Sequence, residues 1–205
     1  MKLYFVRHGE SEANVLKVIS NRGLRHGLTA RGRQQAAELA EGLRGASARR
    51  IFSSPLLRAI QTAEVLSGAL GIDYVVTDAL REFDCGIAEG RSDPEAWELH
   101  RRLMEEWLEG GNRAARIEQG ESLFDIQGRF VPFIERLVEE QEEPGDSVLV
   151  GHGGLYLCML PAVLQNVGAE ETLPFPNAAY VLAEARPEGL NCLEWCGRHM
   201  AGRAA

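Results

Sequence analysis

The stretch Lys2-Leu3-Tyr4-Phe5-Val6-Arg7-His8-Gly9-Glu10-Ser11 decides how the rest of the chain is interpreted. Its four consecutive apolar residues, with aromatic and β-branched members, predict a buried strand over 3–6. The strand then breaks at an arginine, a histidine and a glycine. In open α/β sheets the carboxyl ends of the strands bind ligands, and Gly9 lets the backbone turn there. Taken alone, the pattern fits a loop or packing histidine better than a catalytic one.

A second apolar run breaks in the same way near the other end of the chain. The run 147–150 predicts a strand that leads into Gly151-His152-Gly153-Gly154. Parallel strands end at the same edge of a sheet, so His152 is expected close to His8. A helix expected to start at Ser54-Pro55 would add Arg58 one turn from its beginning. Arginines and helix N-termini gathered in this way favour an anion with several oxygens, such as phosphate.

The patterns along the chain predict alternating strands and helices. The expected strands are 3–6, 50–53, 73–76, 147–150, 178–183 and 192–195. The expected helices are 29–44, 54–70, 95–108, 122–140 and 155–165. Thr29 is the expected cap of the first, and Pro132 is expected to kink or divide the fourth. A turn is expected at Pro144-Gly145-Asp146. This alternation indicates the α/β class with a largely parallel sheet. The stretch 91–120 looks like a helical insertion over the sheet's edge or its ligand face.

Composition limits the possible partners. The chain has 205 residues, which suits a single domain over 1–205. Its net charge of -8 argues against nucleic acid and against an anionic membrane surface. No signal peptide or membrane span is visible, and the four cysteines show no paired metal-binding spacing, so we expect a cytoplasmic protein with reduced thiols and no structural metal.

Several motifs in one order give the chain a family resemblance. Arg7-His8-Gly9-Glu10-Ser11 with Asn14 resembles the signature of the histidine phosphatase superfamily, also called the phosphoglycerate mutase-like family. The other matching stretches are 28–36, Phe52-Ser53-Ser54-Pro55-Leu56 with Arg58, Leu80-Arg81-Glu82, Gly120-Glu121-Ser122 and Val150-Gly151-His152-Gly153-Gly154. The resemblance covers 2–182. It implies a three-layer α-β-α sandwich with a mostly parallel central sheet and a helical insertion near the active site.

The resemblance also implies a role for each matching residue. His8 would be the nucleophile and would carry the phosphoryl group as a phosphohistidine. Glu82 would be the general acid for the leaving oxygen and then the base that activates water. The phosphate oxygens would be bound by Arg7, Asn14, Arg58, His152 and the N–H of Gly153. No metal or other cofactor is implied, because phosphoryl transfer mainly requires positioning and charge stabilisation.

The cations expected at this site should lower the pKa of both reacting groups, His8 and Glu82, which suits the first and opposes the second. They should hold His8 neutral, which a nucleophile needs. They should also lower the pKa of Glu82, although an acid must be protonated, so we expect Glu82 to be competent only when a phosphate dianion is bound.

The favoured activity is a metal-independent phosphatase acting on a small phosphorylated metabolite. Three differences from the family pattern favour it over the runner-up, a phosphoglycerate mutase: Ala13 replaces a tryptophan, Ala88 replaces an aromatic residue, and Arg25-His26-Gly27-Leu28-Thr29 replaces Asp-x-Pro-Leu-Thr. A phosphohistidine protein phosphatase and a non-catalytic phospho-ligand binder are the remaining alternatives. Substrate-tail contacts are expected within 19–27 and 85–120, with six arginines as candidates: Arg22, Arg25, Arg81, Arg91, Arg113 and Arg116. His100 is expected to have no catalytic role, and Trp97 is expected to be a packing residue.

Overall fold

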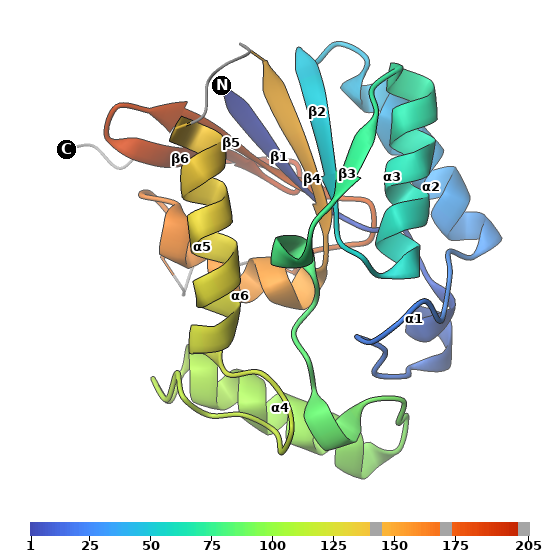
Figure 1. Cartoon of the computed structure of the whole chain (residues 1–205), viewed down its shortest axis with the longest axis vertical. Coiled ribbons are helices and arrows are strands. Elements are labelled where there is room, and N and C mark those ends of the chain that lie inside the picture. The colour runs from blue at the N-terminus through green and yellow to red at the C-terminus, as the bar shows by residue number, and fades with distance from the viewer. Residues whose placement is uncertain (140–144, 169–173, 201–205) are drawn as a thin grey trace.

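A computed structural model describes residues 1–139, 145–168 and 174–200. In this part of the chain a seven-stranded sheet has the order β3-β2-β4-β1-β5-β6-β7 and lies between two layers of helices (Figure 1). The strands are β1 (Lys2–Arg7), β2 (Ala48–Ser53), β3 (Tyr74–Val76), β4 (Asp146–Gly151), β5 (Tyr180–Arg186), β6 (Gly189–Trp195) and β7 (Arg198–His199). The three-layer α/β prediction is confirmed.

The sheet is mixed, and its parallel half carries the strand ends of interest. β1 pairs in parallel with β4, β4 with β2, and β2 with β3, whereas β5, β6 and β7 pair antiparallel. Arg7 is opposite Gly151 and Ser53 is opposite Val150. Three chain breaks therefore meet at one sheet edge, as the sequence predicted.

Helices cover both faces of the sheet. They are α1 (Glu12–Leu16), α2 (Ala30–Leu43), α3 (Leu57–Leu70), α4 (Pro94–Leu108), α5 (Leu123–Glu139) and α6 (Gly153–Val163), with short 3-10 turns η1 (Asp78–Leu80) and η2 (Gly86–Ala88). In Figure 1, α2 and α3 cover one face, α5 and α6 cover the other, and α4 crosses below the sheet. None of the described helices is long and apolar enough to span a bilayer.

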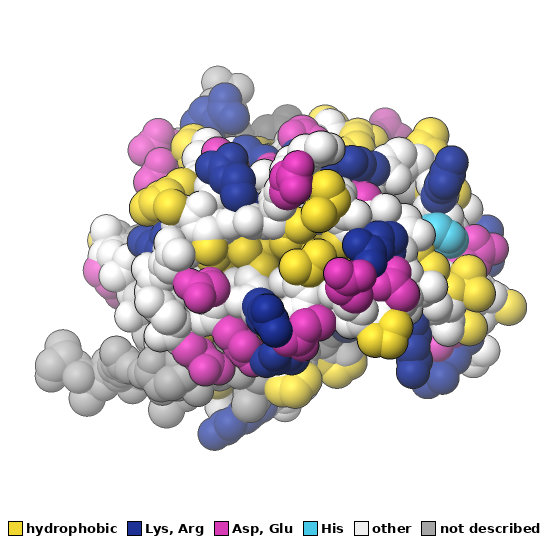
Figure 2. Space-filling view, turned by 90° about the horizontal axis from the view of Figure 1, so that it is seen from below, with side chains coloured by type: hydrophobic (Ala, Val, Ile, Leu, Met, Phe, Trp, Pro, Cys, Tyr) yellow, Lys and Arg dark blue, Asp and Glu magenta, His cyan; other side chains and the backbone are white. Residues whose placement is uncertain are grey.

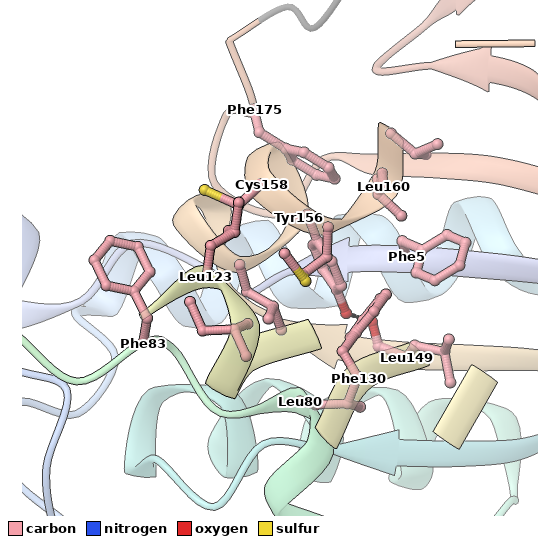
Figure 3. Packing of buried hydrophobic residues seen from close by; sticks show 14 of the residues in the cluster. Phe5, Leu80, Phe83, Leu123, Phe130, Leu149, Tyr156, Cys158, Leu160 and Phe175 are labelled. Carbon is pink, nitrogen blue, oxygen red and sulfur yellow. Dashed lines mark hydrogen bonds between the residues drawn. The ribbon is translucent and has the colours of Figure 1, made fainter. Parts of the chain in front are cut away.

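Alternation along β1 shows why its run of apolar residues is continuous. Tyr4 and Val6 join the core under α2 and α3, whereas Leu3 and Phe5 join the core under α5 and α6. A strand buried on both faces needs apolar residues at every position. In the second core, Phe5 contacts Tyr156 edge-on at 5.6 Å, and the hydroxyl of Tyr156 donates to the Leu149 carbonyl at 2.6 Å (Figure 3).

Two predicted helices have other bounds in the structure: α6 covers Gly153–Val163 instead of 155–165, and α3 begins at Leu57 instead of Ser54. The Ser54 N–H continues the sheet by donating to the Val150 carbonyl at 2.9 Å, and the chain then bends at Pro55 and Leu56. Pro132 does not divide α5, which excludes one of its two predicted effects; apolar residues are buried on both sides of it. Glu140 and Pro144, which belonged to the predicted helix end and turn, lie outside the described residues.

Candidate active site

A pocket of about 480 Å³ opens at the carboxyl ends of β1, β4 and β2. It combines the predicted anion-binding end with a wall from α4 and from the loop that follows α1. The residues that line it are Arg7, His8, Ala13, Asn14, Val18, Ile19, Ser20, Asn21, Arg58, Glu82, Trp97, His100, Met104, Gly153, Gly154, Leu157, Pro174, Phe175 and Pro176. The predicted insertion 91–120 therefore lies over the ligand face, and α4 is the part of it that lines the pocket.

His8 follows β1 and is held in one tautomer by two contacts. Arg58 Nε donates to His8 Nε2 at 3.0 Å, so Nε2 must accept. The proton is then on Nδ1, which donates to the Gly9 carbonyl at 2.6 Å. Burial, followed by the charges of Arg58 and Arg7, lowers the pKa of His8 well below its ordinary value. The neutral ring that the sequence predicted is thus favoured, with its Nε2 lone pair toward the cations.

Arg58 lies in the first turn of α3 and is 5% exposed. Its Nη1 donates to the Ser20 carbonyl at 2.6 Å, and its Nη2 donates to Asn21 Oδ1 at 3.2 Å. Burial lowers the pKa of Arg58 to about 10, so the guanidinium remains positive at neutral pH. The loop that follows α1 therefore fixes the orientation of this cation.

His152 and Arg7 lie near His8, and each has a buried nitrogen without a partner among the described residues. The rings of His8 and His152 have centroids 5.1 Å apart, and His152 Nε2 meets Ser54 Oγ at 2.7 Å. Arg7 Nη1 donates to the Phe175 carbonyl. Among the described residues, Arg7 Nε and His152 Nδ1 are buried and have no hydrogen-bond partner. Buried nitrogens without partners are uncommon in native proteins. Arg7 lines the pocket, whereas His152, also predicted to bind phosphate, is fully buried and is not among the lining residues.

Two glycines at the start of α6 allow close approach of the site side chains. A Cβ on Gly153 would be 3.2 Å from Arg7 Nε, and one on Gly154 would be 3.0 Å from both carboxylate oxygens of Glu82. Gly154 N–H donates to Glu82 Oε2 at 3.0 Å. The N-terminus of α6 thus faces the pocket with oriented N–H groups and a partial positive charge.

Glu82 is half-buried and lines the same pocket. Burial raises the pKa of Glu82 above its ordinary value, against the lowering effects of Arg58 and of the N–H groups of Phe83, Gly154 and Leu155. The sequence-based prediction of a lowered pKa was wrong, because loss of hydration outweighs the nearby cation. A raised pKa suits a proton donor, even before a phosphate is bound.

Asn14 lines the pocket from α1, but its carbonyl oxygen is already occupied. Asn14 Oδ1 accepts from the Ser11 N–H at 3.0 Å and from Asn177 Nδ2 at 3.2 Å. Only its amide NH₂ remains for an anion.

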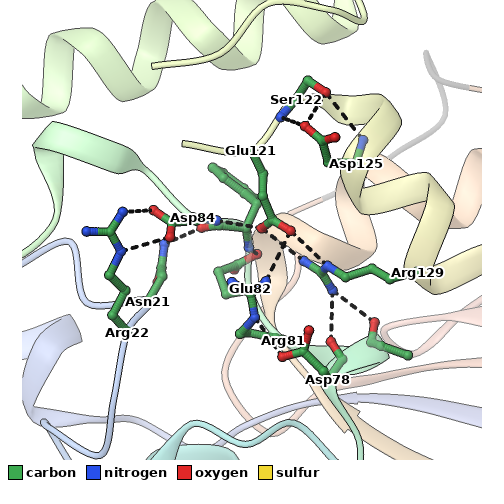
Figure 4. A network of polar contacts seen from close by, with 12 residues as sticks. Asn21, Arg22, Asp78, Arg81, Glu82, Asp84, Glu121, Ser122, Asp125 and Arg129 are labelled. Atoms are coloured by element: carbon green, nitrogen blue, oxygen red, sulfur yellow. Dashed lines mark hydrogen bonds and ion pairs between the residues drawn. The ribbon is translucent and has the colours of Figure 1, made fainter. Parts of the chain in front are cut away.

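A network beside Glu82 fastens the loop that carries it (Figure 4). Glu121 Oε2 accepts from the Asp84 N–H at 2.8 Å, and Glu121 Oε1 accepts from Arg81 Nη2 at 3.1 Å. Arg129 Nε donates to the same Oε1 at 3.1 Å, and its Nη1 donates to the Ala79 carbonyl at 3.0 Å. The Gly120-Glu121-Ser122 motif therefore holds the backbone on both sides of the acid.

Several contributors were missed by the sequence analysis. Ser54 directly follows β2, so the same strand-end argument could have found it. Trp97 was expected to be a packing residue and His100 to have no catalytic role; both line the pocket, within the range 85–120 where substrate contacts were expected. None of the six candidate arginines is among the lining residues, and several are held elsewhere: Arg22 by Asp84, Arg81 by Asp78 and Glu121, Arg91 by Asp93 and Glu95, and Arg116 by Asp125.

The arrangement can bind a phosphoryl group, supply a nitrogen nucleophile and supply a carboxyl group whose pKa is raised. Among the described residues, no group of three or more His, Cys, Asp or Glu side chains is placed to hold a metal ion. Chemistry without a metal remains a prediction.

Comparisons with known proteins agree with this geometry. A family model described as the histidine phosphatase superfamily (branch 1) matches residues 3–197. A probable phosphoglycerate mutase GpmB from Proteus mirabilis is 34% identical over 170 residues, covering 80% of this chain and 75% of that protein. A mycobacterial glucosyl-3-phosphoglycerate phosphatase, in a complex with VO3, superimposes with a TM-score of 0.81 at 27% identity over 95% of this chain and 98% of its own. A protein titled mycobacterial hydrolase 1 gives 0.82 at 26% identity over 96% and 98%.

Proposed function

The chain belongs to the histidine phosphatase superfamily (branch 1), and we propose that it is a metal-independent phosphatase that hydrolyses a small phosphomonoester through a phosphohistidine on His8. The observation that carries this proposal is the arrangement around His8: its Nδ1 donates to the Gly9 carbonyl, its Nε2 faces Arg58, and the buried Nε of the pocket residue Arg7 has no partner among the described residues. Phosphoryl oxygens would accept from Arg7 Nε and from the N–H of Gly153, since the N–H of Gly154 is already bonded to Glu82.

The first step transfers the phosphoryl group to the protein. When the phosphoryl group binds, Arg58 Nε gives up its hydrogen bond to His8 Nε2 and donates to a phosphoryl oxygen instead, which frees the Nε2 lone pair. His8 Nε2 attacks phosphorus, the bond from phosphorus to the alcohol oxygen breaks, and Glu82 gives its proton to the departing oxygen. Arg7 and Arg58 stabilise the charge on the transferring oxygens. The ring becomes positive in the phosphoenzyme, and its Nδ1–H still donates to the Gly9 carbonyl.

The second step reverses the role of the acid. Ionised Glu82 takes a proton from a water molecule, whose oxygen attacks phosphorus as the bond to Nε2 breaks. Phosphate leaves, His8 returns to its neutral form, and Glu82 is again protonated. Burial favours this protonated form, since it raises the pKa of Glu82.

A phosphoglycerate mutase is the second candidate, because the relative from Proteus mirabilis carries that name. A mutase would return the phosphoryl group to a second hydroxyl of its substrate. The mycobacterial glucosyl-3-phosphoglycerate phosphatase supports hydrolysis instead, at lower identity over a larger share of this chain. The changes at Ala13 and Ala88, both pocket or core positions here, also favour the phosphatase.

The test is phosphate release from a panel of phosphomonoesters with EDTA present, beside a mutase assay on 3-phosphoglycerate. Free phosphate supports the hydrolase, and isomer formation without phosphate supports the mutase. Acid-labile phosphate on the wild type, and its absence from His8→Ala, would assign the nucleophile. Substantial hydrolysis by pure His8→Ala would overturn that assignment.

A further inference from the structure

The pocket has two chemically different ends. At the sheet edge it is lined by Arg7, His8 and Arg58. On the α4 side the described lining changes to aromatic and apolar side chains, namely Trp97, His100, Met104 and Leu157. A substrate whose phosphate lies at the first end must place its alcohol part against the second.

The aromatic side chains of this wall hold one another in fixed positions. The His100 ring stacks on Phe83 with centroids 5.5 Å apart and planes at 26°, and Trp97 meets it edge-on at 5.3 Å. Trp97 is 38% exposed, yet its Nε1 donates to the Lys17 carbonyl at 2.8 Å, which fixes the indole against the loop after α1. Rigid aromatic surfaces bind flat rings at a low cost in side-chain entropy.

The wall also lacks the charge that a carboxylate substrate would need. Among the described lining residues, Arg7 and Arg58 are the only arginines or lysines, and both belong to the phosphate end. Arg22 and Arg91, on neighbouring loops, are held by Asp84 and Asp93 at 2.7 Å. The sequence 169–173, next to the lining residue Pro174, contains no lysine or arginine.

Hydrophobic side chains are also exposed on the outer face of the molecule on the α4 side. Figure 2, seen from the α4 side, shows hydrophobic side chains between acidic and basic ones. The exposed arginines of α4 are paired along the helix with its own glutamates, as Arg101 is with Glu98 and Glu105. Burial lowers the pKa of His100, so its ring is neutral at pH 7 and offers hydrogen bonds without charge.

Building on the proposed phosphatase function, we propose that the alcohol part of the substrate is an uncharged ring group that packs against Trp97, His100 and Met104. A short chain ending in a carboxylate, such as a phosphoglycerate, would leave that carboxylate beside an apolar wall and near Glu82. Loss of its hydration would then be uncompensated. The α4 insertion would thus set specificity for the ring.

The test compares esters that share a primary alkyl leaving group and differ only at the far end. We expect kcat/KM for 2-phenylethyl phosphate to exceed that for ethyl phosphate and for 3-phosphooxypropanoate by about tenfold or more. In Trp97→Ala the ratio of 2-phenylethyl phosphate to ethyl phosphate should fall toward one, mainly through KM, because the lost contact holds the ring in ground and transition state alike. Trp97→Arg should reverse the preference toward the carboxylate ester.

The matched control is Phe124→Ala, which removes an aromatic residue that is 56% exposed and does not line the pocket. Its preference for the ring ester should equal that of the wild type. Equal or faster turnover of the carboxylate ester by the wild type, or a preference that Trp97→Ala leaves intact, would overturn the inference.

Binding to His8→Ala, measured by calorimetry with the same three esters, separates this inference from the proposed function. If the wild type turns over none of the esters while His8→Ala binds 2-phenylethyl phosphate more tightly than the other two esters, only the proposed phosphatase function is contradicted. Turnover without any ring preference would contradict only the inference about the wall.

Discussion

Removing the hydroxyl of Ser54 should damage the site without removing any residue of the predicted phosphate-binding set. Ser54 is fully buried, and its Oγ is the hydrogen-bond partner of His152 Nε2 at 2.7 Å. In Ser54→Ala this nitrogen loses its partner, beside an Nδ1 that has none among the described residues. The imidazole would then be free to turn away from the phosphoryl position.

The size of the effect follows from the contact that is lost. Leaving a buried polar group without a partner costs about 1–3 kcal/mol. If most of that cost falls on the transition state, kcat/KM drops about 5- to 100-fold, since each 1.36 kcal/mol is a factor of ten. The assay is steady-state phosphate release from the best ester of the panel, with the melting temperature measured alongside.

The neighbouring serine provides the matched control. Ser53 is equally buried, but its hydroxyl donates to the Ser54 carbonyl at 2.9 Å and does not contact His152. Ser53→Ala should lower stability by a similar amount and leave kcat/KM near the wild-type value. If the two variants retain equal activity, the hydroxyl of Ser54 does not orient His152 and the reasoning fails.

Three further variants test the acid and its supports. Burial raises the pKa of Glu82, and the protonated acid is lost as the pH rises through that pKa, so wild-type kcat/KM should fall on the alkaline side. The pH profile of Glu82→Gln should lack this alkaline fall. A variant that keeps the fall unchanged would contradict the role of Glu82 as the acid. Gly154→Ala places a Cβ 2.6 Å from Phe83 Cε1 and 3.0 Å from both Glu82 oxygens, so Phe83 and Glu82 must both shift. This variant should lower kcat at least tenfold while vanadate binding persists, and a normal kcat would show that the acid tolerates displacement. Glu121→Gln weakens the contacts to Arg81 and Asp84, and the fold decrease in kcat should be about ten times the fold change in KM. The control Glu118→Gln changes an exposed residue and should have no effect. Equal kinetic constants for the two variants would show that Glu121 has only a structural role.

The sequence could predict the anion-binding half of the pocket because local patterns determine it. Two apolar runs ending at Arg7-His8 and Gly151-His152 had to meet once both strands were parallel neighbours, and Arg58 followed from its distance after β2. The start of α3 was harder to predict. Propensity alone makes Ser54 a helix cap, whereas in the structure its hydroxyl is hydrogen-bonded to His152.

The other half could not be predicted from periodicity. Trp97 and His100 form the wall only because α4 crosses the pocket and contacts the loop after α1, and no local pattern encodes contacts between segments about 80 residues apart. The direction of the Glu82 pKa was wrong for a related reason. Glu82 lies in an irregular stretch, and its surroundings depend on Gly154 and on the loop held by Glu121.

The position of β1 has a consequence for how the protein is made. Its neighbours in the sheet are β4 and β5, which follow it by about 140 and 180 residues, and the main chain at Arg7 and His8 is hydrogen-bonded to Ala178 and Asn177. A ribosome that has synthesised the first strand must therefore produce most of the remaining chain before this strand can pair. Until then the apolar residues 3–6 are an unpaired, aggregation-prone strand, and such long-range pairing slows folding. His8, the proposed nucleophile, is thus synthesised about 170 residues before Ala178 and Asn177, which complete its main-chain hydrogen bonds.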